Sequence, residues 1–523
     1  MMKMLLTAAL AAATALPLGG APPTAVAEPY ESPAAALRLG PIDALVFRQL
    51  DRLKIQPANL CSDAVFVRRV YLDGIGTLPT AYEAQEFIRD QSPGKRRVLI
   101  DRVLEKDQFA DYWAMKWSDM LRIKAEFPIN LWPNAAQAYH RWIHSCLQEN
   151  VPYDRIARDL LISSVSNFRV PPVNFYRAMQ SKEPSGIAQA VALVFLGERA
   201  DKWPREKLAG MAAFFTQVGY KSTGEWKEEI VYFNPQTTNA ATTAVFPDGT
   251  AVRLSPDRDP REVFADWLLD PKNPRFAKNT VNRVWCWLLG RGIVHEPDDF
   301  RPDNPPSNPE LLDNLAAQFV DSHNDLKGIF RLILNSRTYQ LSSLARNQTP
   351  EAAANFAAYP LRRLEAEVLI DALNQITGTK ENYSSPIPEP FTYIPDTQRS
   401  IALADGSVTS PFLEMFGRPP RDTGLDSERN NRISADQELH LLNSSHILQK
   451  IENSRMIQYQ MQSARGPRAI ANGLYLGILS RYPAEDELRT VEAYAQSSGL
   501  RPRDAAVDLA WALINSAEFL YRH

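Results

Sequence analysis

The densest group of side chains that could do chemistry lies in one proline-rich acidic loop. Within nine residues this loop holds five candidate ligands or titratable groups: His295, Glu296, Asp298, Asp299 and Asp303. Such a density of oxygen ligands could hold calcium or supply a general acid and base. The spacing differs from an EF-hand loop, which needs acids at alternating positions around a glycine. We favour the simpler interpretation, in which Asp298 and Asp299 pair with Arg291 or Arg301 in a surface network.

Two histidines form a second candidate site. His140 and His144 are four residues apart in a predicted helix over residues 137–147, so both imidazoles could meet one zinc ion. No glutamate occupies the general-base position of a hydrolytic zinc motif. Trp142, Ile143 and Leu147 are more typical of an ordinary packed helix.

Aromatic and arginine residues give two further candidates for ligand binding. The aromatic run could stack on sugar rings if it is exposed, but its helical spacing favours a core: Trp113, Trp117, Trp132, Tyr139 and Trp142. Arg418, Arg421 and Arg429 could grip an acidic sugar or an acidic motif of a partner, because guanidinium groups bind carboxylate or sulfate in a bidentate way. We favour pairing of these arginines with the acids of residues 362–371. No nucleophile elbow and no glycine-rich phosphate loop occurs.

Composition limits the class of protein. The 523 residues are 45% hydrophobic and 23% charged, which is typical of a globular chain. The 58 basic and 61 acidic residues give a net charge of −3, without the basic excess that nucleic-acid binding requires. After the N-terminal segment, the longest apolar run spans residues 188–196 and predicts a buried helix, because it is too short to span a membrane.

The first 27 residues predict a signal peptide. Lys3 precedes an apolar stretch over residues 4–18, and the small residues Ala25 and Ala27 mark a cleavage site. We expect a mature chain that begins at Glu28 and is exported to the periplasm or beyond; an N-terminal anchor is the alternative. Only three cysteines follow, so at most one disulfide can form, and the pairing stays open: Cys61, Cys146 and Cys286.

A helical unit recurs along the chain. An apolar helix over residues 65–75 precedes a capping box of Thr80 and Glu83 and another helix over residues 98–104. The same order returns over residues 474–519, and a weaker copy starts at residues 281–289 with Ser307 as the expected cap. Two more helix starts are expected at Asp259 and at Asn150.

Strand signals are few. Residues 230–233 and 243–254, which turn on residues 247–249, predict a hairpin between the two halves of the chain. A further signal covers residues 399–403 in an irregular, proline-rich stretch over residues 383–420. We therefore expect a mainly α fold of two helical lobes built from related units, with a small β-hairpin insertion.

Several segments resemble a known pair of families. Residues 68–80, 195–197 and 210–215 resemble the planctomycete cytochrome-type domain of unknown function. Segments of the second half resemble the planctomycete-specific domain of unknown function that follows it: 282–285, 290–294, 298–301, 362–367 and 441–444. The resemblance implies an N-terminal domain over residues 28–222, a linker over 223–260 and a C-terminal domain over 261–523.

The chain departs from this family where a cofactor would bind. The resemblance implies a C-x-x-C-H haem-attachment motif after the segment that ends at Gly197, and a second cysteine-bearing segment after residues 416–419. Both stretches lack cysteine and histidine in this sequence. We therefore expect no covalent haem and no other cofactor, with calcium or zinc as the alternatives at His140, His144, His295 and Asp303.

These observations predict an exported, non-catalytic scaffold or binding protein that engages a protein partner or a polysaccharide. We expect no binding to nucleic acid and no membrane-spanning segment. A second hypothesis is a secreted hydrolase of anionic polysaccharide that uses Glu296, Asp298 and Asp299, with Arg418 or Arg421 holding the sugar. A third is a metal-dependent redox protein without covalent haem.

Overall fold

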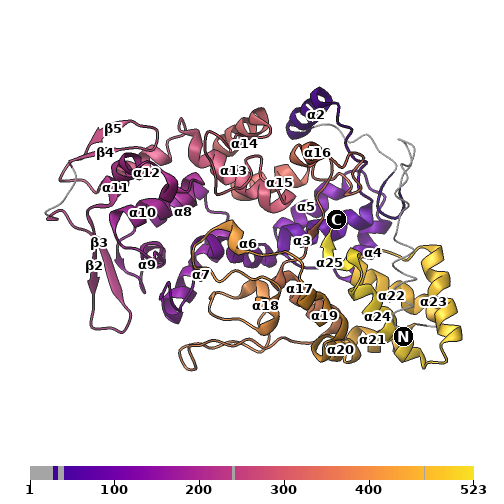
Figure 1. Cartoon of the computed structure of the whole chain (residues 1–523). Helices are drawn as coiled ribbons and strands as arrows, with labels where there is room; N and C mark the ends of the chain where they lie inside the picture. Colours follow the sequence, from indigo (N-terminus) through magenta and orange to yellow (C-terminus); the bar gives the residue numbers. More distant parts are fainter. Residues whose placement is uncertain (1–26, 33–39, 238–241, 465) are drawn as a thin grey trace.

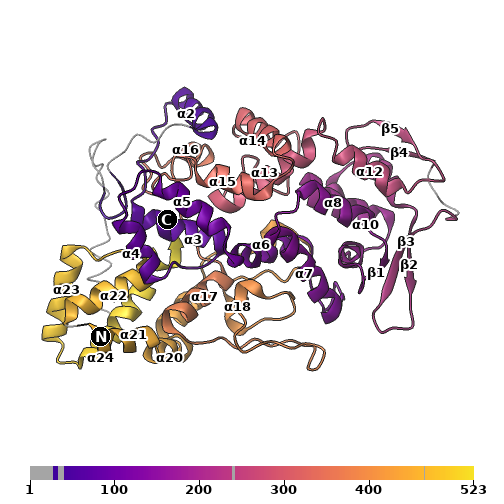
Figure 2. The same cartoon turned by 180° about the vertical axis from the view of Figure 1, so that it is seen from behind.

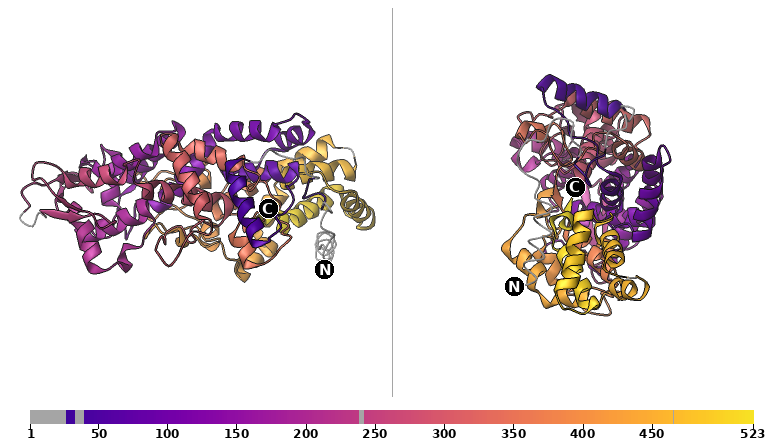
Figure 3. Two further views of the ribbon diagram at one scale, coloured as in Figure 1. Left: turned by 90° about the horizontal axis from the view of Figure 1, so that it is seen from above. Right: turned by 90° about the vertical axis from the view of Figure 1, so that its right-hand side faces the viewer.

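The computed structural model describes residues 27–32, 40–237, 242–464 and 466–523. The predicted signal peptide lies outside these residues, apart from Ala27. The molecule is elongated, with the strands of residues 165–253 at one end and the C-terminal helices at the other (Figure 1, Figure 2), and it is compact when seen along its long axis (Figure 3). The predicted mainly α fold is confirmed. Within the described ranges, no helix has the length and apolar character needed to cross a membrane.

The first helical unit forms as its capping residues predict. It comprises α2 (Pro41–Leu53), α3 (Asp63–Ile75), α4 (Ala81–Arg89), α5 (Lys95–Leu104) and α6 (Asp107–Met120). Helix α3 ends at Gly76 with φ of 60°, a conformation that glycine adopts without strain. The capping box at α4 is confirmed, because Thr80 accepts from Glu83 N and Glu83 accepts from Thr80 N.

The last unit repeats this order and packs against the first. It comprises α22 (Pro467–Leu479), α23 (Glu485–Ser497), α24 (Pro502–Ile514) and α25 (Ala517–Leu520). Helix α22 ends at Ser480 with φ of 61°, and Glu487 accepts from Ala484 N at 2.7 Å, as Glu83 does from Thr80 N. The buried Arg68 of α3 donates to the carbonyls of Ile478 and Phe519. The two ends of the sequence therefore share one interface.

The middle unit lies beside them. It comprises α13 (Pro274–Leu289), α14 (Pro309–Asp321) and α15 (Leu326–Leu334), and α16 (Pro350–Ala354) follows. Asn308, not the expected Ser307, caps α14, and its side chain accepts from Leu311 N. The reason is Pro309, whose fixed φ sets the first helical position and leaves the preceding residue as the cap.

The remaining helices of the first half form the other end of the molecule: α7 (Pro133–Gln148), α8 (Tyr153–Ile162), α9 (Asn174–Arg177), α10 (Pro184–Val191), α11 (Arg205–Ala212) and α12 (Pro260–Leu268). Residues 188–196 form the predicted buried helix, which continues α10 as a π-turn over Ala192–Leu196. Asp259 caps α12 as expected. Asn150 does not cap α8, because its amide oxygen accepts from Lys327 N and its amide nitrogen donates to Asp325.

The strands form three small sheets. One is antiparallel, in the order β1 (Val165–Ser166), β3 (Glu229–Phe233) and β2 (Val218–Ser222). The hairpin of β4 (Thr243–Val245) and β5 (Ala251–Arg253) turns on residues 247–249 as predicted. Residues 230–233 do not join that hairpin, because β2 and β1 occupy both edges of β3. The third sheet pairs β6 (Arg362–Arg363) with β7 (Tyr521–Arg522) at the C-terminus.

The second half adds α17 (Ala366–Thr377), α18 (Pro411–Met415), α19 (Ala435–Asn443), α20 (Ser445–Glu452) and α21 (Arg455–Ser463). The strand expected over residues 399–403 is wrong, since Ser400–Ala402 form a 3-10 turn. The backbone N–H groups of Ser400 and Ile401 donate to the buried carboxylate of Asp371 and cannot join a strand ladder.

One contiguous core joins both halves of the sequence. Its buried apolar side chains run from Ile42 to Phe519 and include the helices of all three units. The buried Arg69 of α3 adds a polar link, because it donates to the carbonyls of Tyr339, Leu341 and His523. The two lobes of the sequence are therefore packed into one continuous body.

Candidate functional site

The acidic loop is anchored by a buried ion pair. Asp298 is buried, with Oδ1 at 2.6 Å from Arg283 Nη2 and Oδ2 accepting from Asp426 N at 2.7 Å. Asp298 thus does not join the surface network that we favoured; it ties the acidic loop to the loop that follows α18. Burial, with the nearby Asp298 carboxylate, raises the pKa of Asp426.

The other acids of this loop do form surface pairs. Asp299 and Asp303 both contact Arg301, at 3.1 and 3.2 Å, and Glu296 contacts Arg199 at 3.2 Å. Partial burial and the guanidinium of Arg291 lower the pKa of His295. The loop therefore presents its carboxylates already neutralised by arginine.

The histidine pair lies on α7. The two ring centroids are 6.3 Å apart, and His144 Nε2 lies 3.1 Å from Asp111 Oδ1. Burial and the charge of Arg421 lower the pKa of His140 to about 3, so its imidazole is neutral near pH 7. In the part of the chain that the structure describes, no group of three or more His, Cys, Asp or Glu residues is placed to hold a metal ion. Zinc and calcium stay predictions.

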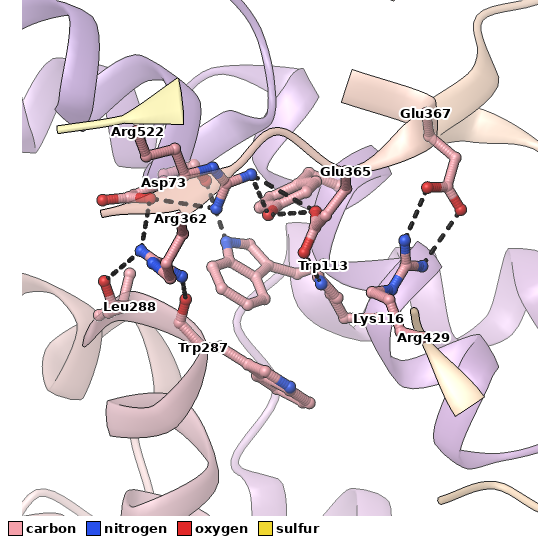
Figure 4. Close-up of polar contacts among 12 residues, drawn as sticks. Asp73, Trp113, Lys116, Trp287, Leu288, Arg362, Glu365, Glu367, Arg429 and Arg522 are labelled. Atoms are coloured by element: carbon pink, nitrogen blue, oxygen red, sulfur yellow. Dashed lines mark hydrogen bonds and ion pairs between the residues drawn. The ribbon is translucent and has the colours of Figure 1, made fainter. Parts of the chain in front are cut away.

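The arginines after α18 turn inward. Arg429 contacts Glu367 and Asp119, both at 2.6 Å, and Arg421 contacts Asp119 at 2.9 Å. Arg418 lies 3.5 Å from Glu367. Figure 4 shows that both terminal nitrogens of the Arg429 guanidinium donate to the Glu367 carboxylate. Arg418 and Arg429 therefore pair with Glu367 as we favoured, whereas Arg421 binds Asp119, which lies outside residues 362–371. Arg418 and Arg421 are buried, and the side chain of Arg429 is only 9% exposed, so the three are not open to an acidic sugar.

A second network of buried charges lies beside these pairs (Figure 4). Glu365 binds Lys116, Tyr112 and Arg522, and Asp73 of α3 accepts from Arg362 and Arg522. Burial acts to raise the pKa of Glu365, but Lys116 and Arg522 outweigh it and hold the pKa well below its usual range. The network joins the first helices, α17 and the last residues of the chain.

Three residues of the predicted aromatic run are core, and two, Trp132 and Trp142, are only partly buried. Trp113, Trp117 and Tyr139 are buried. Trp132 is only partly buried, and its ring lies 5.4 Å from Phe391 and 6.4 Å from Trp226 by their centroids. Trp226 is 70% exposed and Phe391 51%. We call Trp132, Trp226 and Phe391 the aromatic platform.

Three segments that are distant in sequence build the platform. Trp132 caps α7, Trp226 sits in the turn between β2 and β3, and Phe391 lies in the long loop before Ser400. The end of the β2–β3 hairpin, one end of α7 and the tip of that loop lie near one another (Figure 1, Figure 2). Trp132 adopts φ of 72°, an uncommon backbone conformation for a bulky residue. Phe127 and Tyr393, on two of the same loops, are also exposed.

A polar cleft of about 470 Å³ is lined in part by residues 396–399, at the end of the same long loop. It opens among the α3–α4 turn, the start of α6, the second half of α17, residues 379–381 and residues 396–399. Its lining includes carboxylates, amides and hydroxyls, with Glu83, Asp371, Asn374, Glu381, Asp396 and Arg399 among them. Burial raises the pKa of Asp371 to about 6, although Arg399 and two backbone N–H groups act to lower it.

The residues present do not fit a covalent haem. A side chain at Gly197 would meet Asn279 Oδ1 at 2.5 Å, and the next residue, Glu198, pairs with Lys207 and Arg275. The second segment carries Arg421 and Arg429, which bind Asp119. Neither segment supplies a thiol or an imidazole. The three cysteines are free, buried and elsewhere in the fold.

Sequence reasoning missed the platform residues Trp226 and Phe391. The available signal was their position: Trp226 lies shortly before the predicted strand of residues 230–233, and Phe391 lies between prolines in a stretch without helical or strand periodicity. A bulky aromatic residue in such a segment has no regular element to carry it into a core, so exposure is the simpler expectation.

Comparison with known proteins identifies both halves of the chain. Residues 41–219 match PSCyt2, described as a protein of unknown function (DUF1549). Residues 260–495 match PSD1, described as a protein of unknown function (DUF1553). Searches of curated proteins and of solved structures found no significant match. The chain therefore belongs to these families of unknown function, with a PSCyt2 domain followed by a PSD1 domain.

Proposed function

We propose that this is an exported, non-catalytic binding protein that holds polysaccharide on the aromatic platform. The observation that carries the proposal is the contact of three aromatic rings, two of them largely exposed, from three separate segments. Leaving such rings in water forgoes the stabilisation that burial would give, so their grouping calls for a ligand. The apolar faces of sugar rings pack well on flat aromatic rings.

Two features favour a polysaccharide over a protein partner. The platform members are all aromatic, and its neighbouring exposed residues on the same loops, Phe127 and Tyr393, are aromatic as well. The long loop that carries Phe391 also lines the polar cleft, which offers amides and hydroxyls for hydrogen bonds to sugar hydroxyls. Export, expected from the first 27 residues, brings the protein to the compartment where polysaccharides occur.

The hydrolase hypothesis has weaker support. The carboxylates that it would use are engaged: Asp298 with Arg283, Asp299 with Arg301 and Glu296 with Arg199. An arginine partner occupies the carboxylate oxygens that would have to reach the glycosidic bond.

Affinity gel electrophoresis tests the proposal. The mature chain is run through gels that contain neutral polysaccharides, such as β-glucan, xylan and mannan, or anionic ones, such as alginate. We expect at least one polysaccharide to retard the wild-type protein, and the double variant Trp226→Ala with Phe391→Ala to lose that retardation. Tyr459→Ala is the matched control, because Tyr459 is 65% exposed but lies on α21. Retardation by no polysaccharide, or equal retardation of the double variant, would overturn the proposal.

A further inference from the structure

The polar cleft has a rigid floor of paired charges. Glu83 binds Lys106 at 2.7 Å and accepts from Thr80, and Glu381 binds Lys450 at 3.1 Å and His446 at 2.9 Å. Asp371 accepts from two backbone N–H groups and lies 3.7 Å from Arg399. Each of these carboxylates is fixed in place by its partners, so the floor is organised before any ligand arrives.

The rim of the cleft carries polar side chains of a different kind. Among the described residues, no side-chain hydrogen bond or ion pair engages Gln108, Thr397, Asp396 or Lys380, although all four line the cleft. An amide and a hydroxyl that have no protein partner can exchange water for a ligand without breaking a contact of the fold.

The charges of the cleft cancel. The three floor carboxylates each face a cation, and the remaining Asp396 and Lys380 are of opposite sign. The cleft therefore offers no excess charge to select an anion or a cation. Tyr71, Ile75 and Leu78 also line the cleft, but they are almost fully buried and offer little apolar surface to a ligand. A small neutral ligand with many hydroxyls matches this combination.

We propose that the cleft is a second binding site, for a short neutral saccharide segment. Its volume of about 470 Å³ lies within the roughly 300–1,000 Å³ of small-molecule sites. This inference rests on the proposed function, since the loop that carries Phe391 of the platform reaches the cleft at Asp396. The two positions are five steps apart along the chain, so their Cα atoms are at most about 18 Å apart. The cleft binds a part of the same chain that the platform holds.

Isothermal titration calorimetry with soluble neutral hexasaccharides of β-1,4-glucan, β-1,3-glucan, xylan and mannan tests the cleft. We expect one of them to bind the wild-type protein and the double variant Gln108→Ala with Thr397→Ala to weaken binding by roughly tenfold, through two lost hydrogen bonds. Gln462→Ala is the control, because Gln462 is exposed on α21, away from the cleft lining. A midpoint of thermal unfolding equal to that of the wild type confirms that each variant is folded.

The outcomes separate this inference from the proposed function. A hexasaccharide that binds the double cleft variant as tightly as the wild type would overturn the cleft site. So would the absence of hexasaccharide binding by a protein whose platform still retards in polysaccharide gels. If the platform variant loses gel retardation but still binds the hexasaccharide, the result supports two separate sites. If no polysaccharide retards the wild type but a hexasaccharide binds through Gln108 and Thr397, the platform proposal fails and the cleft stands.

Discussion

At the scale of single residues, the buried charges decide how this protein is held together. Asp73, Glu365 and Glu367 are almost inaccessible to solvent, and each is bound by arginine or lysine from a distant segment. The sequence indicated that the two arginine-rich and acidic segments pair. It could not indicate that Arg522, next to the C-terminus, joins them, because nothing in a local pattern specifies a contact across 449 residues.

Removal of one partner from this network should be costly. Glu365→Ala leaves Lys116 and Arg522 buried without their shared carboxylate, so we expect the free energy of unfolding to fall by about 3–5 kcal/mol. Urea unfolding followed by circular dichroism measures the change. Glu310→Gln is the control, because the ion pair of Glu310 with Arg48 is half exposed. Its loss should lower the free energy of unfolding by less than about 1 kcal/mol. Equal effects of the two variants would contradict the account.

Asp371 predicts a dependence of stability on pH. Its pKa is raised to about 6 in the fold, against about 3.9 in an unfolded chain, so the native state binds this proton more tightly. The carboxyl therefore stabilises the fold below about pH 4, and this contribution, up to about 3 kcal/mol, is lost as the pH rises through about 6. Relative to the wild type, Asp371→Asn should gain stability from pH 4 to pH 7 in urea titrations. A constant difference between the two proteins across this range would refute the assignment.

At the scale of elements, the same helical unit is used at both ends of the chain. Capping residues and the turn after the first helix predicted its boundaries well, because these signals are local. The expected strand over residues 399–403 does not form, because the backbone N–H groups of Ser400 and Ile401 donate to the carboxylate of Asp371. Asp371 lies in another segment of the chain, so no local pattern indicates this contact. The sheet of β1, β2 and β3 was only partly foreseen, because its strands are short and its pairing joins residues 165 and 231.

Removal of the helix caps at α4 and α23 should lower the free energy of unfolding by different amounts. Thr80→Ala removes an exposed cap and should lower the free energy of unfolding by about 1 kcal/mol. Glu487→Ala removes a cap and also the carboxylate that binds the buried Arg481, so we expect a loss of about 3–5 kcal/mol. Thr80→Ser, which keeps the hydroxyl, should be close to the wild type. If the two alanine variants lose the same free energy, the second role of Glu487 is refuted.

At the scale of the whole molecule, the two matched families are joined by one core. Arg68 and Arg69 of the first domain donate to carbonyls near the C-terminus, and the apolar core runs without interruption between the halves. The sequence predicted two domains from the order of their segments. It could not reveal how closely they pack, because the contacts join residues hundreds of positions apart.

This shared core predicts that the domains do not fold separately. A fragment of residues 28–259 would expose the surface of α4 that contacts α22, and would leave Arg68 and Arg69 without carbonyl partners near the C-terminus. We expect one cooperative transition for residues 28–523 in differential scanning calorimetry, and no cooperative transition for fragments 28–259 or 260–523. Two independent transitions whose enthalpies sum to that of the mature chain would contradict a single body.

The central claim is that polysaccharide lies on the aromatic platform, and quenching of tryptophan fluorescence by iodide tests it most directly. Trp226 is exposed to 70%, whereas Trp113, Trp117 and Trp285 are buried, so iodide should quench a component of the emission that Trp226→Ala lacks. With the polysaccharide that retards the protein in gels, at saturation, we predict that this component becomes protected. Unchanged quenching of Trp226 while the polysaccharide is bound would contradict the claim.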